Sequence, residues 1–138
     1  MSGDNTIFPG KGLLIAGIVH LSGSEALQAA RAGALLVDLR SPLETDYKKF
    51  AVPEVRYIPF EEIGERMTEI PRDRPVILAD SVGLRSKDAV KYLMDQGFTN
   101  LANLNGGILD WEHDGLPLVV DLNKQLSGSC TCRLKPRT

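Results

Sequence analysis

One stretch, residues 76–96, constrains the fold of this chain more than any other, because it predicts a strand, a tight loop and a helix in direct succession. Residues 76–79 are an apolar run without an internal polar residue, which is typical of a buried parallel strand. Residues 86–96 predict a helix that Gly97 ends. The side chains expected on the buried face of this helix are Ala89, Val90, Leu93 and Met94.

The loop between this strand and this helix predicts a site for an anion. Successive backbone N–H groups and the positive end of the helix dipole converge on one point in such a turn. The first loop residue, where a loop of this kind holds its reactive atom, is Asp80. The predicted anion-binding loop consists of Asp80, Ser81, Val82, Gly83, Leu84, Arg85 and Ser86.

Strands and helices alternate along the rest of the chain. Ser22 and Glu25 have the spacing of a capping box and predict the start of a helix. Residues 34–37 predict a second buried strand, and Ser41-Pro42 predicts the cap and first residue of a short helix. This alternation predicts an α/β fold with a parallel sheet that is covered by helices on both faces.

Three further segments give expectations about single elements. Residues 13–19 are apolar and predict one edge strand. Apolar residues recur at intervals of three and four over residues 60–70, which predicts one amphipathic helix ended by Pro71. Residues 101–104 predict a further strand.

The chain divides into three predicted parts. Residues 1–17 are expected to be a lead-in segment, residues 18–122 one domain, and residues 123–138 a flexible tail that carries Cys130 and Cys132. With 138 residues and 43% hydrophobic residues, the chain is long and apolar enough to form one core.

Composition also limits the classes of partner and compartment. A net charge of −2 gives no basic surface for nucleic acid or an anionic membrane, so neither partner is expected. The longest uncharged apolar stretch, residues 12–19, is shorter than a membrane span and lacks the features of a secretory signal. Cysteines one residue apart are poorly placed to link parts of a fold, which favours a reducing cytoplasm.

A series of short motifs, each weak evidence of a family when taken alone, occurs along the chain in the order in which one known family has them. These motifs are residues 24–26, 33–44, 58–59, 73–78, 83–86, 97–100, 104–108, Trp111 and residues 115–117. With them the chain resembles a rhodanese-like domain over roughly residues 18–119. The resemblance implies a sheet of about five parallel strands flanked by helices.

The resemblance also implies a chemistry for the loop. In the family the loop begins with a cysteine that takes up sulfane sulfur as a persulfide and transfers it. Gly83, Arg85 and Ser86 fix the alignment without a gap, so that position is occupied by Asp80. The loop has the length found in sulfur-transfer members, whereas related phosphatases and arsenate reductases carry one more residue. A second departure is Ala-Val-Pro-Glu-Val at residues 51–55, where the family usually has His-Ile-Pro-Gly-Ala.

A carboxylate at position 80 removes sulfur transfer at this loop, because a persulfide requires a polarizable thiolate. Ser81 is adjacent, but neither His20 nor His113 lies near it in sequence to act as a base. Our hypothesis is that the Asp80 carboxylate fills the place of the anion, accepting loop N–H groups and facing Arg85. An aspartyl nucleophile for phosphoryl transfer is the alternative role for Asp80.

The tail offers a second possible site. Cys130 and Cys132 are followed by Arg133, Lys135 and Arg137, and basic neighbours raise the thiolate fraction of a cysteine. One hypothesis is that these cysteines carry or resolve sulfur; the other is that they are two exposed thiols without this role. Two thiolates do not complete a tetrahedral zinc site, so no metal is expected.

The remaining candidates have structural interpretations. Asp38 and Arg40 follow a strand and are expected to lock the turn there, although a strand end can also face a ligand. Trp111 is expected in the core, and Gly106-Gly107 is expected to allow a close backbone approach.

These observations favour a module that binds or regulates a protein partner or a small anion, with Asp80 and Arg85 in the family's catalytic positions, and without a cofactor. The alternative is a sulfurtransferase or persulfide carrier that uses Cys130 and Cys132. Whether the chain is an enzyme is left open between them.

Overall fold

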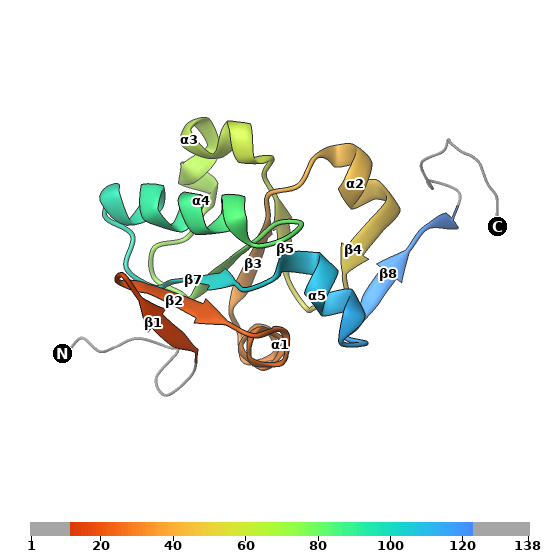
Figure 1. The fold of residues 1–138 in the computed structure, drawn as a ribbon. Helices are drawn as coiled ribbons and strands as arrows, with labels where there is room; N and C mark the ends of the chain where they lie inside the picture. The colour runs from red at the N-terminus through yellow and green to blue at the C-terminus, as the bar shows by residue number, and fades with distance from the viewer. Residues whose placement is uncertain (1–11, 123–138) are drawn as a thin grey trace.

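The computed structural model describes residues 12–122, and within them a central sheet of six strands has the spatial order β1-β2-β7-β6-β3-β5. The strands are β1 (Leu13–Ile15), β2 (Ile18–Leu21), β3 (Leu35–Asp38), β5 (Val55–Tyr57), β6 (Val76–Ala79) and β7 (Leu101–Leu104). Five of these strands run parallel, and β1 pairs antiparallel with β2 at the edge (Figure 1). The predicted α/β fold with a parallel sheet is therefore confirmed.

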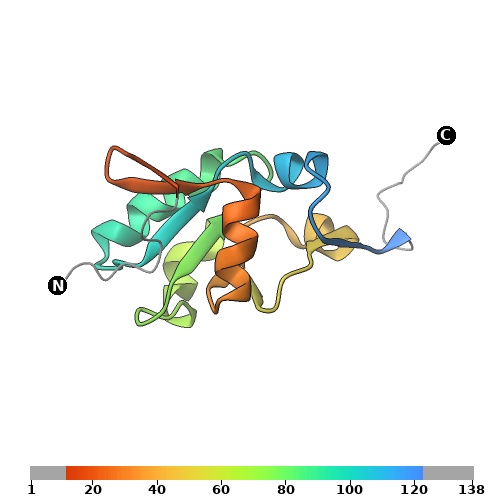
Figure 2. The ribbon, with the colours of Figure 1, turned by 90° about the horizontal axis from the view of Figure 1, so that it is seen from below.

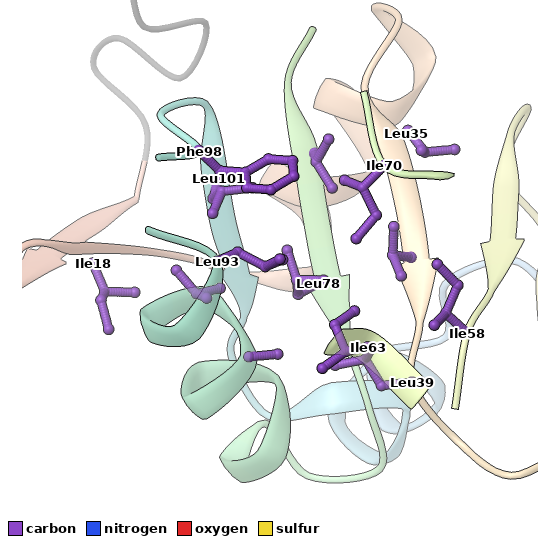
Figure 3. Close-up of a cluster of buried hydrophobic side chains, with 14 residues drawn as sticks. Ile18, Leu35, Leu39, Ile58, Ile63, Ile70, Leu78, Leu93, Phe98 and Leu101 are labelled. Carbon is purple, nitrogen blue, oxygen red and sulfur yellow. The ribbon is translucent and has the colours of Figure 1, made fainter. Parts of the chain in front are cut away.

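Helices cover both faces of this sheet. Helices α1 (Gly23–Arg31) and α5 (Gly107–His113) pack on one face, whereas α3 (Ile63–Arg66) and α4 (Leu84–Asp95) pack on the other. Figure 2 shows α1 crossing the sheet on the side opposite α4. Alternate residues of a central strand enter different cores: Ile77 of β6 faces α1, and Leu78 faces α4. The core on the α4 side, drawn in Figure 3, includes Ile18, Leu35, Leu39, Ile58, Ile63, Ile70, Leu78, Leu93, Phe98 and Leu101.

The helix boundaries follow the predicted caps. The Ser22 hydroxyl accepts the Glu25 N–H at 3.2 Å, and the Glu25 carboxylate accepts the Ser22 N–H at 2.9 Å, so the capping box is formed. Ser41 caps α2 (Pro42–Tyr47) in the same way, with Pro42 as its first residue. The second of these caps fixes the start of α2, which contributes Glu44 to the site described below.

Several sequence predictions about elements are wrong. Residues 13–19 form not one edge strand but the β1–β2 hairpin, because Ala16 (φ 52°) and Gly17 (φ 83°) turn the chain. Helix α4 begins at Leu84 rather than Ser86. Met94 is exposed, since it lies about 100° around the helix axis from the buried Leu93, at the edge of the apolar stripe.

Residues 60–70 do not form a single helix. The segment consists of a 3-10 turn η2 (Phe60–Glu62), the one-turn helix α3 and a second 3-10 turn η3 (Met67–Glu69). The backbone of Glu62 (φ −101°, ψ 3°) and Arg66 (φ −113°, ψ 12°) leaves the α region at each junction. Because prolines bound the segment, it is shorter than a helix that holds itself together, although its apolar spacing still buries Ile63 and Ile70.

A second, two-stranded sheet was not predicted. Strands β4 (Lys48–Phe50) and β8 (Leu118–Val120) pair antiparallel and extend from one end of the molecule (Figures 1 and 2). Phe50 packs edge-on against Trp111 with 5.1 Å between ring centroids, and the Trp111 indole donates to the Pro117 carbonyl at 2.8 Å. Trp111 is fully buried, as predicted.

The division into residues 1–17, 18–122 and 123–138 stays a prediction, and the tail lies outside the described residues. The cytoplasmic compartment also stays a prediction. Within residues 12–122, every helix is too short or too polar to cross a bilayer.

Candidate functional site

The predicted loop lies at the carboxyl end of β6, where the chain turns from the sheet into α4 (Figure 1). Gly83 precedes the helix in the left-handed conformation with φ 94°. A Cβ atom there would lie 2.9 Å from the Gly106 backbone nitrogen, which is closer than Cβ contacts occur. The turn therefore requires glycine for both its conformation and its packing.

The Asp80 carboxylate occupies the centre of this loop. Its side chain is only 5% exposed. One oxygen, Oδ2, accepts the Arg85 N–H at 2.8 Å and the Ser86 N–H at 3.3 Å. The other oxygen, Oδ1, accepts the Gly83 N–H in a short hydrogen bond. Three backbone donors that would otherwise face an anion are thus directed at a carboxylate of the chain itself.

Arg85 contributes to the loop differently from the prediction. Its backbone N–H contacts Asp80, whereas its guanidinium forms a 3.6 Å ion pair with Glu61 and lies 5.6 Å from the centre of the Phe60 ring. The cation is drawn toward the segment before α3 because an acidic and an aromatic side chain meet there. The Arg85 side chain is therefore on the rim of the loop.

An open hollow of about 370 Å³ lies over the loop. Arg40 and Glu44 come from the end of β3 and from α2, and the opposite wall is the loop itself. Ser81 faces this hollow with its hydroxyl 3.5 Å from the Glu44 carboxylate. Residues that line the hollow are Leu39, Arg40, Glu44, Asp80, Ser81, Val82, Leu84 and Arg85.

Asp38 and Arg40 form a buried ion pair at the end of β3. The Arg40 guanidinium donates to both Asp38 oxygens, at 3.0 and 2.8 Å, and to the Lys48 carbonyl at 2.7 Å. This pair locks the turn after β3, as predicted from the sequence, and the contact with Lys48 also joins that turn to β4, which was not predicted. Arg40 additionally borders the hollow, whereas Asp38 does not line it.

The first turn of α5 packs directly on the loop. The Ile108 N–H donates to the Asp80 carbonyl at 2.9 Å, and the Leu109 N–H donates to the Ser81 carbonyl at 3.1 Å. A Cβ at Gly107 would lie 2.5 Å from that Asp80 carbonyl oxygen. The predicted close backbone approach at Gly106-Gly107 is therefore confirmed, and the surface approached is the loop.

Sequence reasoning missed a chain of buried polar groups beneath the loop. Ser86 and Asn103 are almost completely buried, and the Ser86 hydroxyl makes a short hydrogen bond to the Asn103 side-chain oxygen. The Asn103 amide nitrogen lies 3.1 Å from Nδ1 of His20 on β2. The available signal was an asparagine inside an otherwise apolar strand, since a buried amide requires polar partners.

The two histidines lie apart from the loop centre. His20 is half-buried, and burial together with the nearby Lys87 lowers its pKa. His113 is exposed at the end of α5. Cys130 and Cys132 lie outside the described residues. Within residues 12–122, no three histidine, cysteine or carboxylate side chains gather closely enough to hold a metal ion.

Comparisons of this chain with a family model and with individual known proteins agree on one family. The model of the rhodanese-like domain matches residues 22–114. A sulfurtransferase from Allochromatium vinosum is 44% identical over 86 residues, which cover 62% of this chain and 78% of that protein. The thiosulfate sulfurtransferase GlpE from Actinobacillus pleuropneumoniae is 29% identical over 89 residues, with the same two shares.

Solved structures agree with this assignment. A rhodanese-related protein from Thermoplasma volcanium superposes with a TM-score of 0.66 at 26% identity, covering 74% of this chain and 98% of that one. The rhodanese-like domain of an Anabaena protein, at 15% identity, shares the fold with a TM-score of 0.66 over 86% of this chain and 92% of its own. Because the family model matches more than half of the chain, this protein belongs to the rhodanese-like domain family.

Proposed function

We propose that this rhodanese-like domain does not transfer sulfur at its own loop and instead serves as a binding or regulatory module. The proposal places Asp80 in the position where the family carries its nucleophilic cysteine, on the alignment of Gly83, Arg85 and Ser86. Sulfur transfer needs a thiolate that attacks sulfane sulfur and is later released from it. A carboxylate does neither.

The observation that carries the proposal is the set of hydrogen bonds to Asp80. Its two oxygens accept the N–H groups of Gly83, Arg85 and Ser86, which are the donors that the loop would offer to an anionic substrate. An internal carboxylate therefore satisfies the loop and stabilises its conformation without a ligand. Phosphoryl transfer through Asp80 is disfavoured on the same ground, because a nucleophile held by three donors is poorly available.

The rim of the hollow favours a protein as the ligand. Apolar side chains surround the loop with large exposed areas, Leu84 being 65% exposed. Exposed apolar side chains that gather around a hollow are typical of protein-binding surfaces. A small anion is the second ligand class, with Arg40 and Arg85 beside the hollow as its cationic groups. Of the exposed apolar side chains in this region, Val82 and Leu84 line the hollow, Leu109 lines the neighbouring hollow together with Val82, and Leu43 precedes Glu44 in α2.

Sulfur transfer from thiosulfate to cyanide tests the proposal. We expect the wild-type protein and Asp80→Ser to proceed at the uncatalysed rate, because neither has a thiol in the loop. Asp80→Cys is expected to gain measurable turnover, since the rest of the loop and its donors are retained. Wild-type turnover that is retained in Asp80→Ser has two sources to separate, the loop and the tail cysteines. If that turnover also persists when both tail cysteines are replaced by serine, the proposal of a silent loop is contradicted.

A second candidate function is a sulfurtransferase or persulfide carrier that uses Cys130 and Cys132. The observation in its favour is where the described chain ends: the Asp121 N–H donates to the Tyr47 carbonyl at 2.8 Å, and Tyr47 lines a hollow that Ser81 also lines. Cys130 follows Leu122 by eight residues, a contour length of about 26–29 Å. This second function requires Cys130 to reach the loop within that length.

The double variant Cys130→Ser/Cys132→Ser separates the two functions. If the wild-type protein accumulates sulfur label from thiosulfate and the double variant does not, the tail carries the sulfur. If neither protein retains label, the binding module stands and the tail function is contradicted. We further propose a reducing cytoplasm as the compartment, because two cysteines one residue apart are poorly placed to link parts of a fold.

A further inference from the structure

The hydrogen bonds of the buried polar chain beneath the loop run in a defined donor-to-acceptor direction, and the Asn103 side chain shows which one. Its amide group touches three partners: the Gly83 carbonyl at 3.4 Å, His20 Nδ1 at 3.1 Å and the Ser86 hydroxyl. A carbonyl only accepts hydrogen bonds, so the atom facing Gly83 is the amide nitrogen. The same nitrogen faces His20, whose Nδ1 must then be an unprotonated acceptor, and the proton of neutral His20 sits on Nε2.

The Ser86 hydroxyl has two acceptors and one proton. It contacts the Asn103 oxygen in the shorter hydrogen bond and Asp80 Oδ1 at 3.3 Å. Neither oxygen can donate, so only one of the two contacts is a hydrogen bond at any time. With the Asn103 amide oriented as described, the proton goes to Asn103, and Asp80 keeps only its backbone donors.

Rotation of the Asn103 amide by 180° would reverse this assignment. The amide nitrogen would donate to the Ser86 oxygen, and the Ser86 proton would turn to Asp80 Oδ1. The amide oxygen would then face His20 Nδ1, a contact that is favourable only if Nδ1 carries a proton. The cost of the rotation is the loss of the weak 3.4 Å contact with the Gly83 carbonyl and the repulsion between the two carbonyl oxygens that would then face each other.

We propose that His20 is a positioning residue for the Asp80 loop: protonation of its Nδ1 turns the Asn103 amide and transfers the Ser86 hydrogen bond from Asn103 to Asp80. One proton enters from solvent at Nδ1, no covalent bond changes within the relay, and the Asp80 carboxylate gains a fourth donor. The consequence for ligand binding rests on the proposed function of the loop. A carboxylate held by four donors leaves the loop less available to an external ligand.

The surroundings of His20 favour its neutral form and hence the described orientation. The hollow that His20 shares is lined by Leu13 and Ile15 from β1, by Asn103 and Asn105 beside it, by the loop, and by Lys87 from α4. Lys87 is the only charged group among those lining residues. Partial burial and this cation lower the pKa of His20. The relay is therefore expected to reverse at a lower pH than that at which an unperturbed histidine titrates.

Nuclear magnetic resonance of the ¹⁵N-labelled full chain tests the relay without any assay of function. At a pH of about 8 we expect the His20 ring to be protonated at Nε2 and not at Nδ1. On acidification, the amide resonances of Gly83 and Arg85 are expected to shift with the same midpoint as the His20 ring. Protonation at Nδ1 in the neutral ring, or loop amides that do not follow His20, would overturn the proposal.

Two variants and a control make the test specific. Lys87→Gln removes the neighbouring cation, so the His20 midpoint should rise and the midpoints of Gly83 and Arg85 should rise equally. His20→Gln should abolish the loop inflection, whereas His113→Gln, which removes the exposed histidine, should leave it unchanged. An inflection retained in His20→Gln refutes the relay. These outcomes do not depend on sulfur transfer, so failure of the relay is distinguishable from failure of the proposed function.

Discussion

At the scale of the residue, the Asp80 side chain organises the loop by accepting three of its backbone N–H groups. The donors that an anion would use are satisfied by the carboxylate, and the left-handed Gly83 keeps the turn. The observed conformation of the loop is thus held by a carboxylate at its start. Under the proposed function the available reaction differs from sulfur transfer, because only a thiol can hold sulfur.

Replacement of this carboxylate should create an anion site. In Asp80→Ala the N–H groups of Gly83, Arg85 and Ser86 lose their acceptor, so we expect a loss of about 2 kcal/mol in the free energy of unfolding. Added sulfate should bind these donors and raise the melting temperature of the variant more than that of the wild-type protein. Chloride at equal ionic strength is the control, and equal sulfate responses of both proteins would show that the loop was never filled.

Asp80 and Asn103 mark the limit of sequence reasoning at this scale. The role of Asp80 as a carboxylate filling the loop was predicted, because strand, loop and helix are contiguous in sequence. Asn103 lies on another strand, and its contact with Ser86 arises only when β7 pairs beside β6 and α4 covers both. A local sequence pattern does not identify which distant residue a side chain will contact. The Arg85 side chain was mispredicted for the same reason, since Glu61 is distant in sequence.

At the scale of the element, the N-terminus of α5 and the loop form one packed unit. Gly107→Ala should destabilise the protein by about 2–4 kcal/mol, because the new methyl group meets the Asp80 carbonyl and the φ of 61° disfavours alanine. Gly115→Ala is the matched control, since φ is 74° there but no described atom lies within 4 Å. Urea unfolding compares them; equal losses in both variants would contradict a tight contact between α5 and the loop.

The amino end of the sheet is held by an ion pair whose strength depends on pH. The Arg74 guanidinium donates to both Glu54 oxygens, at 3.1 and 2.8 Å, which lowers the pKa of Glu54. Its stabilisation is therefore fully present above the pKa of the unfolded state, near 4.5, and is lost as the pH falls through the lower folded value.

Glu54→Gln should accordingly flatten the acid limb of the stability curve. We expect the urea midpoint of the variant to fall less than that of the wild-type protein between neutral pH and about pH 3. Glu65→Gln, which removes a charge from an exposed position on α3, serves as the control and should keep the wild-type slope. Parallel slopes for wild type and Glu54→Gln would refute a structural role for the pair.

At the scale of the whole molecule, the sheet separates two cores. Trp111 belongs to the core beneath α1 and α5, and Ile70 belongs to the core beneath α3 and α4. Trp111→Phe, which removes the donor to Pro117, should cost about 2 kcal/mol, and Ile70→Val about 1 kcal/mol.

The double variant Trp111→Phe/Ile70→Val tests whether these cores act independently. Because the two side chains lie on opposite faces and share no cluster, their costs should add to within about 0.5 kcal/mol in chemical denaturation. A larger coupling energy would mean that the central strands transmit strain between the faces, and the two cores would then have to be treated as one.

The sequence by itself determined the alternation of strands and helices, the capping boxes at Ser22 and Ser41, the family resemblance and the carboxylate at the start of the loop. Each of these depends on residues close together in the chain or on short motifs in order. Only the tertiary structure decided that β1 is a hairpin arm, that β4 pairs with β8, and that α5 seals the loop. The physical reason is that strand partners, buried polar contacts and backbone approaches join residues far apart in sequence, and their energies exist only once the chain is folded.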